Sequence, residues 1–215
     1  MRYFVRRNLT DVPPTRDLPR LFIEIVGKIR KAADGEAEQI VRDELLNKDR
    51  RASRAMFIEK LAGDIYWDNV DVTRFILCRI EEENQTKETF TDLWERDEKR
   101  DFIWTVEHIF PQGPNIPDCW VKMIAGGDAE KAKEYRDKYV HKLGNLTITG
   151  YNSKLGNKSF NEKRDRKDSR GKQVGYCNGL FLNKVLADAK AWTVSDIEER
   201  TARLLELAVK LFALK

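Results

Sequence analysis

Two histidines are present in the chain, and both lie between residues 104 and 163. His108 directly follows Glu107, and His141 lies beyond a loop. A histidine with an ordinary pKa of about 6.5 is neutral at pH 7 and can take a proton from water. Glu107 is a hard oxygen donor of the kind that Mg²⁺ or Mn²⁺ prefers, and Asn152 offers a neutral oxygen. A base and a bound cation are what phosphodiester hydrolysis requires, so these residues predict that chemistry.

The local sequence predicts the order strand, loop, strand, helix. Residues 102–110 are rich in β-branched and aromatic side chains, which favours a strand. Residues 146–149 predict a second short strand, and residues 152–166 predict a helix with an interruption at 156–157. A two-stranded ribbon packed on this helix would bring the helix start close to His108, although the two lie 44 positions apart (152 − 108).

Three sequence blocks in this region resemble a known family. They read Glu-His-Ile-Phe-Pro-Gln from position 107, Leu-Gly-Asn-Leu-Thr from 143, and Asn-Ser-Lys-Leu-Gly-Asn-Lys-Ser-Phe-x-x-Lys from 152. In this order they resemble the C-terminal HNH domain of GmrSD-type restriction proteins, phage-defence enzymes that attack modified foreign DNA. The same domain occurs in phosphorothioate-sensing defence nucleases. The resemblance extends to Trp192 and the leucine-rich tail, which look like the family's closing helix, and to residues 3–9, which look like the segment preceding the domain.

The resemblance implies a role for each of four side chains. His108 would be the general base, and Asn145 the middle asparagine that orients the base and ties the loop. Glu107 and Asn152 would bind one Mg²⁺ or Mn²⁺ at the scissile phosphate, Glu107 from the strand and Asn152 from the helix. The catalytic residues are therefore expected to be His108, Asn145 and Asn152, and the metal ligands Glu107 and Asn152.

Two further residues of the motif are expected to support the site. His141 lies in the segment before Gly-Asn, and a structural hydrogen bond is favoured for it over catalysis. Asn157, beside Gly156, stays open between a turn residue and a support for the ligands. If His108 is the base, activity should fall as the pH drops through its pKa, near 6.5 if unshifted.

Basic residues gather at the predicted metal-site helix. The net charge of the chain is only +4. Residues 154–172 contain eight basic and three acidic side chains, a local charge of +5, so the rest sums to −1. A phosphate backbone requires cations there, which predicts contacts with DNA rather than only a solvated helix face. The expected contacts are Lys154, Lys158, Lys163, Arg164, Arg166 and Lys167.

The flanking sequence predicts mostly helix. Residues 1–16 predict an extended arm, and residues 180–191 predict a helix. A capping box at 195–198 predicts the start of the last helix. The expected fold class is mainly α with a small ββα-metal (HNH) core, in which a helical bundle surrounds a two-stranded β-ribbon and the metal-site helix. Its parts are a helical part (1–100), the nuclease core (101–172) and closing helices (173–215), expected to form one structural domain.

Composition places the chain among soluble proteins. Of its 215 residues, 35% are charged and 41% hydrophobic, and no apolar run approaches the roughly 20 residues that span a bilayer. Its start lacks the apolar core of a signal peptide. Three cysteines, far apart and without a Cys-x-x-Cys pair, favour a reduced cytoplasmic protein without structural zinc. The expected partners are DNA and, as the resemblance implies, an upstream sensor or NTPase domain.

Two other functions stay open at this point. The chain could be a nucleic-acid-binding or partner-docking module with a silent site, although Glu107, His108, Asn145 and Asn152 are all intact. It could also be an RNase, which would use the same mechanism on another substrate. The sequence does not distinguish a nick from a double-strand break, nor does it identify a recognised modification or an oligomeric state.

Overall fold

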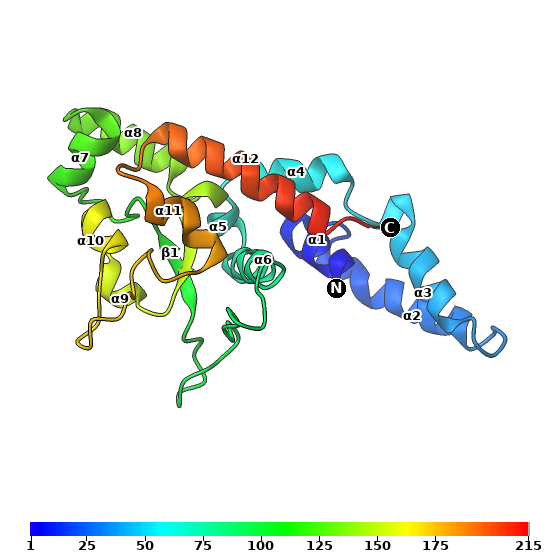
Figure 1. Cartoon of the computed structure of the whole chain (residues 1–215). Helices are drawn as coiled ribbons and strands as arrows, with labels where there is room; N and C mark the ends of the chain where they lie inside the picture. The colour runs from blue at the N-terminus through cyan, green and yellow to red at the C-terminus, as the bar shows by residue number, and fades with distance from the viewer. Residues whose placement is uncertain (215) are drawn as a thin grey trace.

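A computed structural model describes residues 1–214, apart from the side chains of Ser153 and Lys154 (Figure 1). Helices predominate in this part of the chain, and its one sheet has two strands. The predicted fold class, mainly α with a small β-ribbon, is confirmed. None of the described helices is both long enough and apolar enough to cross a membrane.

In chain order the elements are α1 (Arg2–Thr10), η1 (Thr15–Asp17), α2 (Leu18–Ile29), α3 (Ala37–Leu46), η2 (Lys48–Arg50), α4 (Arg54–Ala62), α5 (Ile65–Asp68), α6 (Val70–Glu82), β1 (Thr105–His108), α7 (Asp118–Ala125), α8 (Ala129–Tyr139), η3 (Leu143–Asn145), β2 (Leu146–Thr149), α9 (Asn152–Leu155), α10 (Phe160–Arg164), η4 (Phe181–Asn183), α11 (Lys184–Asp188) and α12 (Val194–Leu211).

The predicted ribbon and its broken helix are both present. Strands β1 and β2 pair antiparallel, with His108 opposite Leu146. Strand β2 has the predicted bounds, whereas β1 is shorter than the predicted 102–110. The predicted helix is divided into α9 and α10 at Gly156, whose φ of 36° lies in the left-handed region. A capping box between Ser159 and Glu162 then begins α10.

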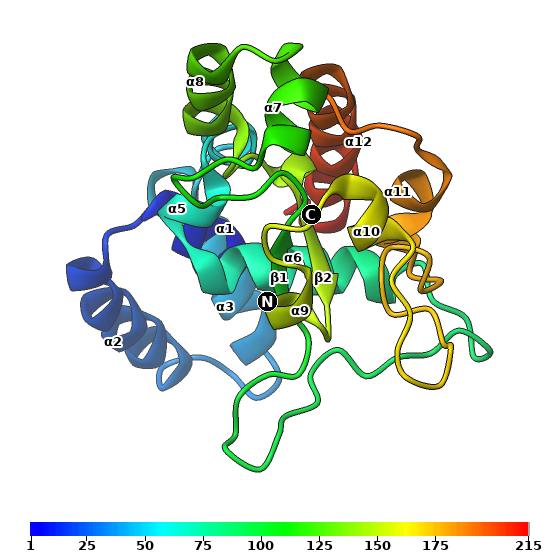
Figure 2. The ribbon, with the colours of Figure 1, turned by 90° about the vertical axis from the view of Figure 1, so that its left-hand side faces the viewer.

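Helices enclose the ribbon and fix its position. Figure 2 shows α6 crossing behind the two strands and α9 in front of them. The largest apolar cluster takes buried side chains from α1, α4, α6, both strands and α12, so it joins all three predicted parts of the chain. A second cluster lies beside the end of β1 and includes Ile109, Phe110, Trp120, Phe160 and Trp192. Helices α2 and α3 form a hairpin that extends away from the ribbon (Figure 1).

The N-terminal prediction was wrong, because residues 1–16 are not an extended arm. Residues 2–10 form helix α1. Val5 and Leu9, four positions apart, bury one face of α1 in the main cluster, together with Phe57 of α4. Arg6 is also buried, so a basic side chain interrupts the apolar pattern that would have predicted this helix.

Two predictions near the C-terminus were also inaccurate. Residues 180–191 do not form one helix, because they divide into η4 and the short α11. The capping box of α12 joins Thr193 and Asp196, two positions before the predicted one. Thr193 is the better N-cap here because its hydroxyl accepts from the backbone of Asp196 while the Asp196 carboxylate accepts from the backbone of Thr193.

Gly144 lets α12 pack directly on the backbone that precedes β2. A Cβ atom at this position would lie 2.1 Å from the Ile197 carbonyl oxygen and 2.3 Å from the Thr201 hydroxyl oxygen. We therefore expect Gly144→Ala to lower the free energy of unfolding by about 1–3 kcal/mol or more, since α12 must move away. Urea denaturation measures this loss. Gly27→Ala, with no atom within 4 Å of the added Cβ, is the control, and equal effects of the two substitutions would contradict the prediction.

Candidate functional site

The two histidines meet at the end of the ribbon. His108 ends β1, His141 follows α8, and their Nε2 and Nδ1 atoms lie 3.3 Å apart. The Tyr66 ring packs edge-on against His108, with centroids 4.5 Å apart, and is stacked on His141 at 5.5 Å. His141 was predicted to have a supporting role, and the structure places it in direct contact with the predicted base. One imidazole donates to the other, so the tautomers of the pair are coupled.

Burial keeps both imidazoles neutral. Only 5% of the His108 surface is exposed. Burial first, and then the neighbouring His141 and Lys163, lower the pKa of His108 from 6.5 to about 3. Burial also lowers the pKa of His141, and the Asp64 carboxylate opposes that shift. Because its pKa is about 3, His108 is neutral over the whole range from pH 5 to pH 8. The neutral imidazole is the form that can accept a proton.

The low pKa changes the expected pH dependence. The predicted fall in activity near pH 6.5 is not expected from His108, because its folded-state pKa is about 3. The pKa of His108 is about 6.5 in the unfolded chain and about 3 in the folded chain. Between these two values the unfolded chain binds a proton that the folded chain does not. Stability is therefore lost as the pH falls below about 6.5, by about 1.4 kcal/mol per pH unit from this group. Urea midpoints at pH 7, 6 and 5 measure this slope. His108→Gln should reduce it, and an unchanged slope would contradict a buried neutral His108.

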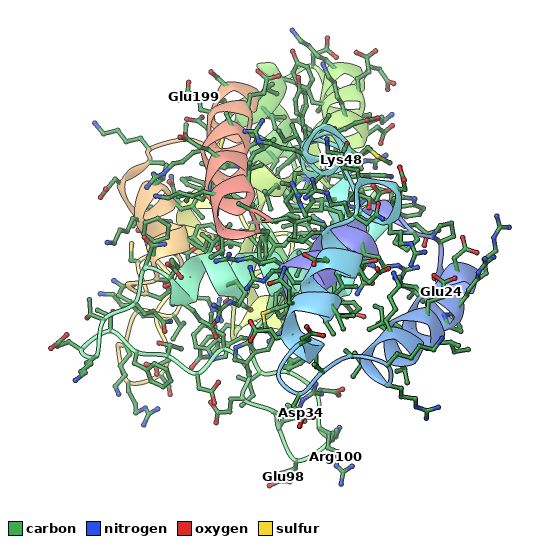
Figure 3. All side chains as sticks on the ribbon, turned by 90° about the vertical axis from the view of Figure 1, so that its right-hand side faces the viewer. Glu24, Asp34, Lys48, Glu98, Arg100 and Glu199 are labelled. Atoms are coloured by element: carbon green, nitrogen blue, oxygen red, sulfur yellow. The ribbon has the colours of Figure 1, made fainter. Side chains whose placement is uncertain are left out.

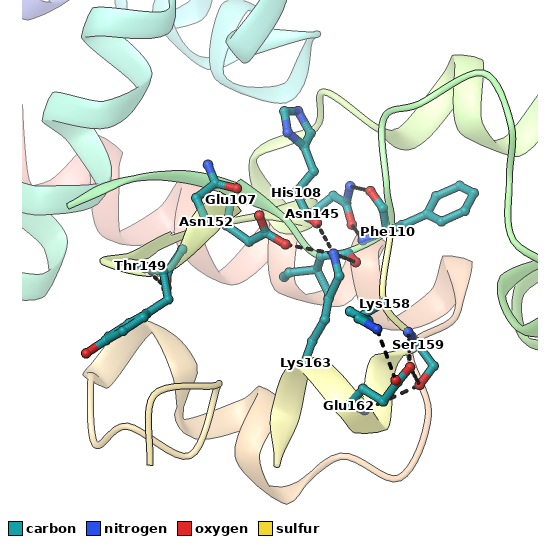
Figure 4. Close-up of polar contacts among 12 residues, drawn as sticks. Glu107, His108, Phe110, Asn145, Thr149, Asn152, Lys158, Ser159, Glu162 and Lys163 are labelled. Atoms are coloured by element: carbon teal, nitrogen blue, oxygen red, sulfur yellow. Dashed lines mark hydrogen bonds and ion pairs between the residues drawn. The ribbon is translucent and has the colours of Figure 1, made fainter. Parts of the chain in front are cut away.

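Glu107 and Lys163 form a buried ion pair on the other side of β1. The Lys163 Nζ atom lies 2.7 Å from Glu107 Oε1 and also donates to the carbonyls of His108 and Ile109, at 2.8 and 3.1 Å (Figure 4). Lys163 is 0% exposed and Glu107 is 3% exposed. Three acceptors satisfy the three N–H donors of the ammonium group. The pair therefore fixes the end of β1 to α10.

The burial of Lys163 does not fit the predicted contact with DNA. Phe160 and Lys163 lie three positions apart on α10, and both side chains are fully buried. At Lys163, the face of α10 that was predicted to contact solvent or phosphate instead packs against the protein interior. Lys163 therefore acts on Glu107 and the β1 backbone, and its ammonium group is inaccessible to a phosphate.

Asn145 holds the loop that follows His108. Its Oδ1 accepts from the Phe110 N–H at 2.8 Å and from the Trp192 indole N–H at 3.3 Å. Its Nδ2 donates to the carbonyls of Phe110 and Val140, both at 3.0 Å. Asn145 is completely buried. It fixes the backbone two residues beyond His108, and no hydrogen bond in the described structure joins it to the imidazole.

Asn152 lies at the start of α9, against β1. Its Nδ2 donates to the Val106 carbonyl at 2.6 Å and to the Thr105 hydroxyl at 3.3 Å. Figure 4 shows the Asn152 side chain beside that of Glu107, and His108 pointing away from Lys163. Since side chains alternate along a strand, Glu107 and His108 leave β1 on opposite faces. The structure thus brings Asn152 to the strand that carries both residues without joining the Glu107 carboxylate to the imidazole.

The oxygen donors beside β1 are of the chemical kind that a hard divalent cation binds. No group of three or more His, Cys, Asp or Glu side chains able to hold a metal occurs among the described residues. Beside β1 lie one carboxylate, that of Glu107, whose Oε1 is paired with Lys163, and one amide side chain, that of Asn152. Mg²⁺ is commonly held by one or two carboxylates, with waters and substrate phosphates completing its octahedron. A protein cage of several ligands is therefore not required.

The remaining predicted residues occupy different environments. Asn157 is exposed in the link between α9 and α10, and the side chain of Lys154 lies outside the described residues. Lys158 is exposed, 3.7 Å from Glu162. Arg164 donates to Asp165 and to the Ala189 carbonyl, which is a structural role. Arg166 and Lys167, together with Arg170 and Asp168, line a hollow of about 310 Å³ beside Tyr151, the residue before Asn152.

Three aromatic residues of this region were not predicted from the sequence. Tyr66 packs on both histidines, and its neighbour Trp67 is 77% exposed with its ring 5.9 Å from that of His141. Tyr176 is fully buried, and its hydroxyl has no partner among the described residues. Burial and then the nearby Glu107 raise its pKa well above 10. The adjacent pair Tyr66–Trp67 was a weak signal, because the sequence has a second such pair, Tyr3–Phe4, away from the site.

Comparison with known proteins assigns the family. No curated protein matches the chain. The sequence does match the family model described as "GmrSD restriction endonucleases, C-terminal domain" over residues 52–207. This range includes the histidine pair, the ribbon, α9, α10 and most of α12. The chain therefore belongs to the family of GmrSD restriction endonuclease C-terminal domains.

Proposed function

We propose that the chain is a metal-dependent HNH endonuclease domain that hydrolyses phosphodiester bonds of foreign DNA in restriction defence. The observation that carries the proposal is the buried, neutral contact between His108 and His141 at 3.3 Å, at the end of the strand that bears Glu107. Its lowered pKa leaves the His108 imidazole neutral at pH 7, and strongly shifted pKa values of this kind cluster at functional sites. The match to a restriction-endonuclease family supports the same reaction class.

In this proposal His108 is the general base. Its neutral ring takes a proton from the attacking water, and His141, in contact with its Nε2 atom at 3.3 Å, holds the ring in place. Tyr66 fixes the planes of both rings. Asn145 fixes the loop beyond His108, so the ring enters the reaction already oriented.

Glu107 and Asn152 are the proposed metal ligands. A bound Mg²⁺ or Mn²⁺ would supply positive charge at the scissile phosphate and the leaving oxygen. Lys163 orients Glu107 through Oε1 and holds β1 through two carbonyls. Arg166 and Lys167, exposed or half-buried near Tyr151, are the proposed contacts to the DNA backbone. An upstream sensor or NTPase domain and a cytoplasmic location belong to the same proposal.

Cleavage of supercoiled plasmid tests the proposal directly. We expect Mg²⁺ or Mn²⁺ to support conversion to open-circle or linear DNA, and EDTA to abolish it, because the phosphate requires a cation at Glu107 and Asn152. An RNA of the same sequence, tested in parallel, separates a DNase from an RNase. Saturable DNA binding without cleavage under either metal would contradict the proposal and favour a docking module.

A further inference from the structure

A second charged site lies away from the histidine pair. A hollow of about 440 Å³ is formed where α1, the start of α4 and the end of α12 meet. Four basic side chains line it, namely Arg6, Lys48, Arg51 and Arg54, and we call it the basic hollow. Figure 3 shows Lys48 on the side of the molecule opposite to that seen in Figure 2, where the ribbon faces the viewer. The proposed nuclease chemistry uses none of these residues.

Arg6 is the most informative residue of the basic hollow. It is only 5% exposed, and its guanidinium group lies over the Phe57 ring, 4.9 Å from the centroid. Its Nε atom is buried and has no hydrogen-bond partner in the described structure. A buried charged donor without an acceptor costs more free energy than a neutral one, because it loses its hydrogen bonds to water and gains none in the protein. An acceptor brought by a ligand would remove this cost.

Within residues 1–214 the charges of the basic hollow have no counter-ion. Across residues 1–214, none of Arg6, Lys48, Arg51 and Arg54 forms an ion pair with a described acid. Burial first, and then the nearby positive charges of Arg51 and Arg54, lower the pKa of Arg6. Converging cations that repel one another are stabilised by an anion of more than one negative charge.

The start of α4 adds to this positive field. Ser53 is the N-cap, and its hydroxyl accepts from the Met56 N–H at 3.1 Å. Helix α4 has nine residues, Arg54 is its first, and its first turn contains no acid. The partial positive charge of a helix N-terminus favours anions such as phosphate. The helix end and the guanidinium groups therefore favour the same kind of ligand.

The opposite side of the basic hollow is apolar. Val209, Ala213 and Leu214, at the end of α12, line it together with Ala52. A volume of about 440 Å³ lies within the usual size range of small-molecule sites. We propose that the basic hollow binds a nucleoside di- or triphosphate, with the phosphates on the basic residues and the base against the apolar side.

Calorimetric titration of the whole chain tests this proposal. The probes are pyrophosphate, ATP and a short DNA duplex. Arg51→Glu with Arg54→Glu should weaken binding of pyrophosphate and ATP at least tenfold, because two cations become anions. Arg30→Glu with Lys31→Glu is the control, since both residues are exposed, form no described ion pair and give the same change in charge. Arg6→Gln, checked for folding by circular dichroism, should weaken binding in the same direction.

Three results would overturn the proposal. The first is no saturable binding of either small probe, and the second is equal loss in the Arg51/Arg54 variant and in its control. The third is binding of the DNA duplex that depends on Arg51 and Arg54, with no binding of ATP. This result would identify the basic hollow as a contact for the DNA phosphate backbone instead. His108→Ala should bind ATP like the wild type. A failure of the basic hollow is therefore distinguishable from a failure of the nuclease proposal.

Discussion

Replacing His108 by alanine is expected to lower the rate of plasmid cleavage by a factor of about 10² to 10⁴ while DNA binding is retained. In the proposed mechanism the imidazole takes the proton of the attacking water, and within residues 1–214 His141 is the only other histidine in contact with it. His108 is buried at the end of β1 and has no ion pair among residues 1–214, so its removal does not disturb a charged contact to DNA.

The control for this prediction is His141→Ala. His141 contacts His108 through Nδ1 but is more exposed and does not lie on the ribbon, so its loss should cost less than the loss of His108. Initial rates of open-circle formation with Mn²⁺, and binding of the same DNA in EDTA, separate chemistry from affinity. Equal cleavage by His108→Ala and the wild type would remove His108 as the base. A larger loss in His141→Ala would transfer that role to His141.

Local signals predicted the ribbon because they act over short distances. Strand β2 lies between Asn145 and Gly150, so its bounds follow directly from the sequence. The break between α9 and α10 follows from Gly156, which adopts a positive φ. The blocks around His108, Asn145 and Asn152 were sufficient to predict the family, which the match over residues 52–207 confirms.

Contacts between distant segments could not be predicted in the same way. His108 and His141 are 33 positions apart, and Glu107 and Lys163 are 56 positions apart. In the sequence Lys163 is one of several basic residues, and nothing local distinguishes the buried one from its exposed neighbours. Only the packing of α10 against the end of β1 turns Lys163 inward. The lowered pKa of His108 also depends on this packing, since its first cause is burial.

Lys163→Met is expected to lower the free energy of unfolding by about 3–5 kcal/mol, because it leaves the Glu107 carboxylate buried without a partner. The carbonyls of His108 and Ile109 lose a donor in the same change. Lys158→Met is the matched control. Lys158 belongs to the same basic run but is exposed and lies 3.7 Å from Glu162, so its loss should cost at most about 1 kcal/mol.

The double variant Glu107→Gln/Lys163→Met separates the ion pair from simple packing. If the cost of Lys163→Met comes from an uncompensated carboxylate, removing the Glu107 charge as well should restore a large part of the stability. Urea denaturation of the wild type, the two single variants and the double variant measures this. Additive losses would show instead that the two side chains stabilise the fold independently. DNA affinity in EDTA gives a second test, because Lys163 is fully buried. Loss of the Lys163 ammonium group should not change the slope of log binding constant against log salt concentration in the folded protein. Loss of a phosphate contact would reduce that slope by about one.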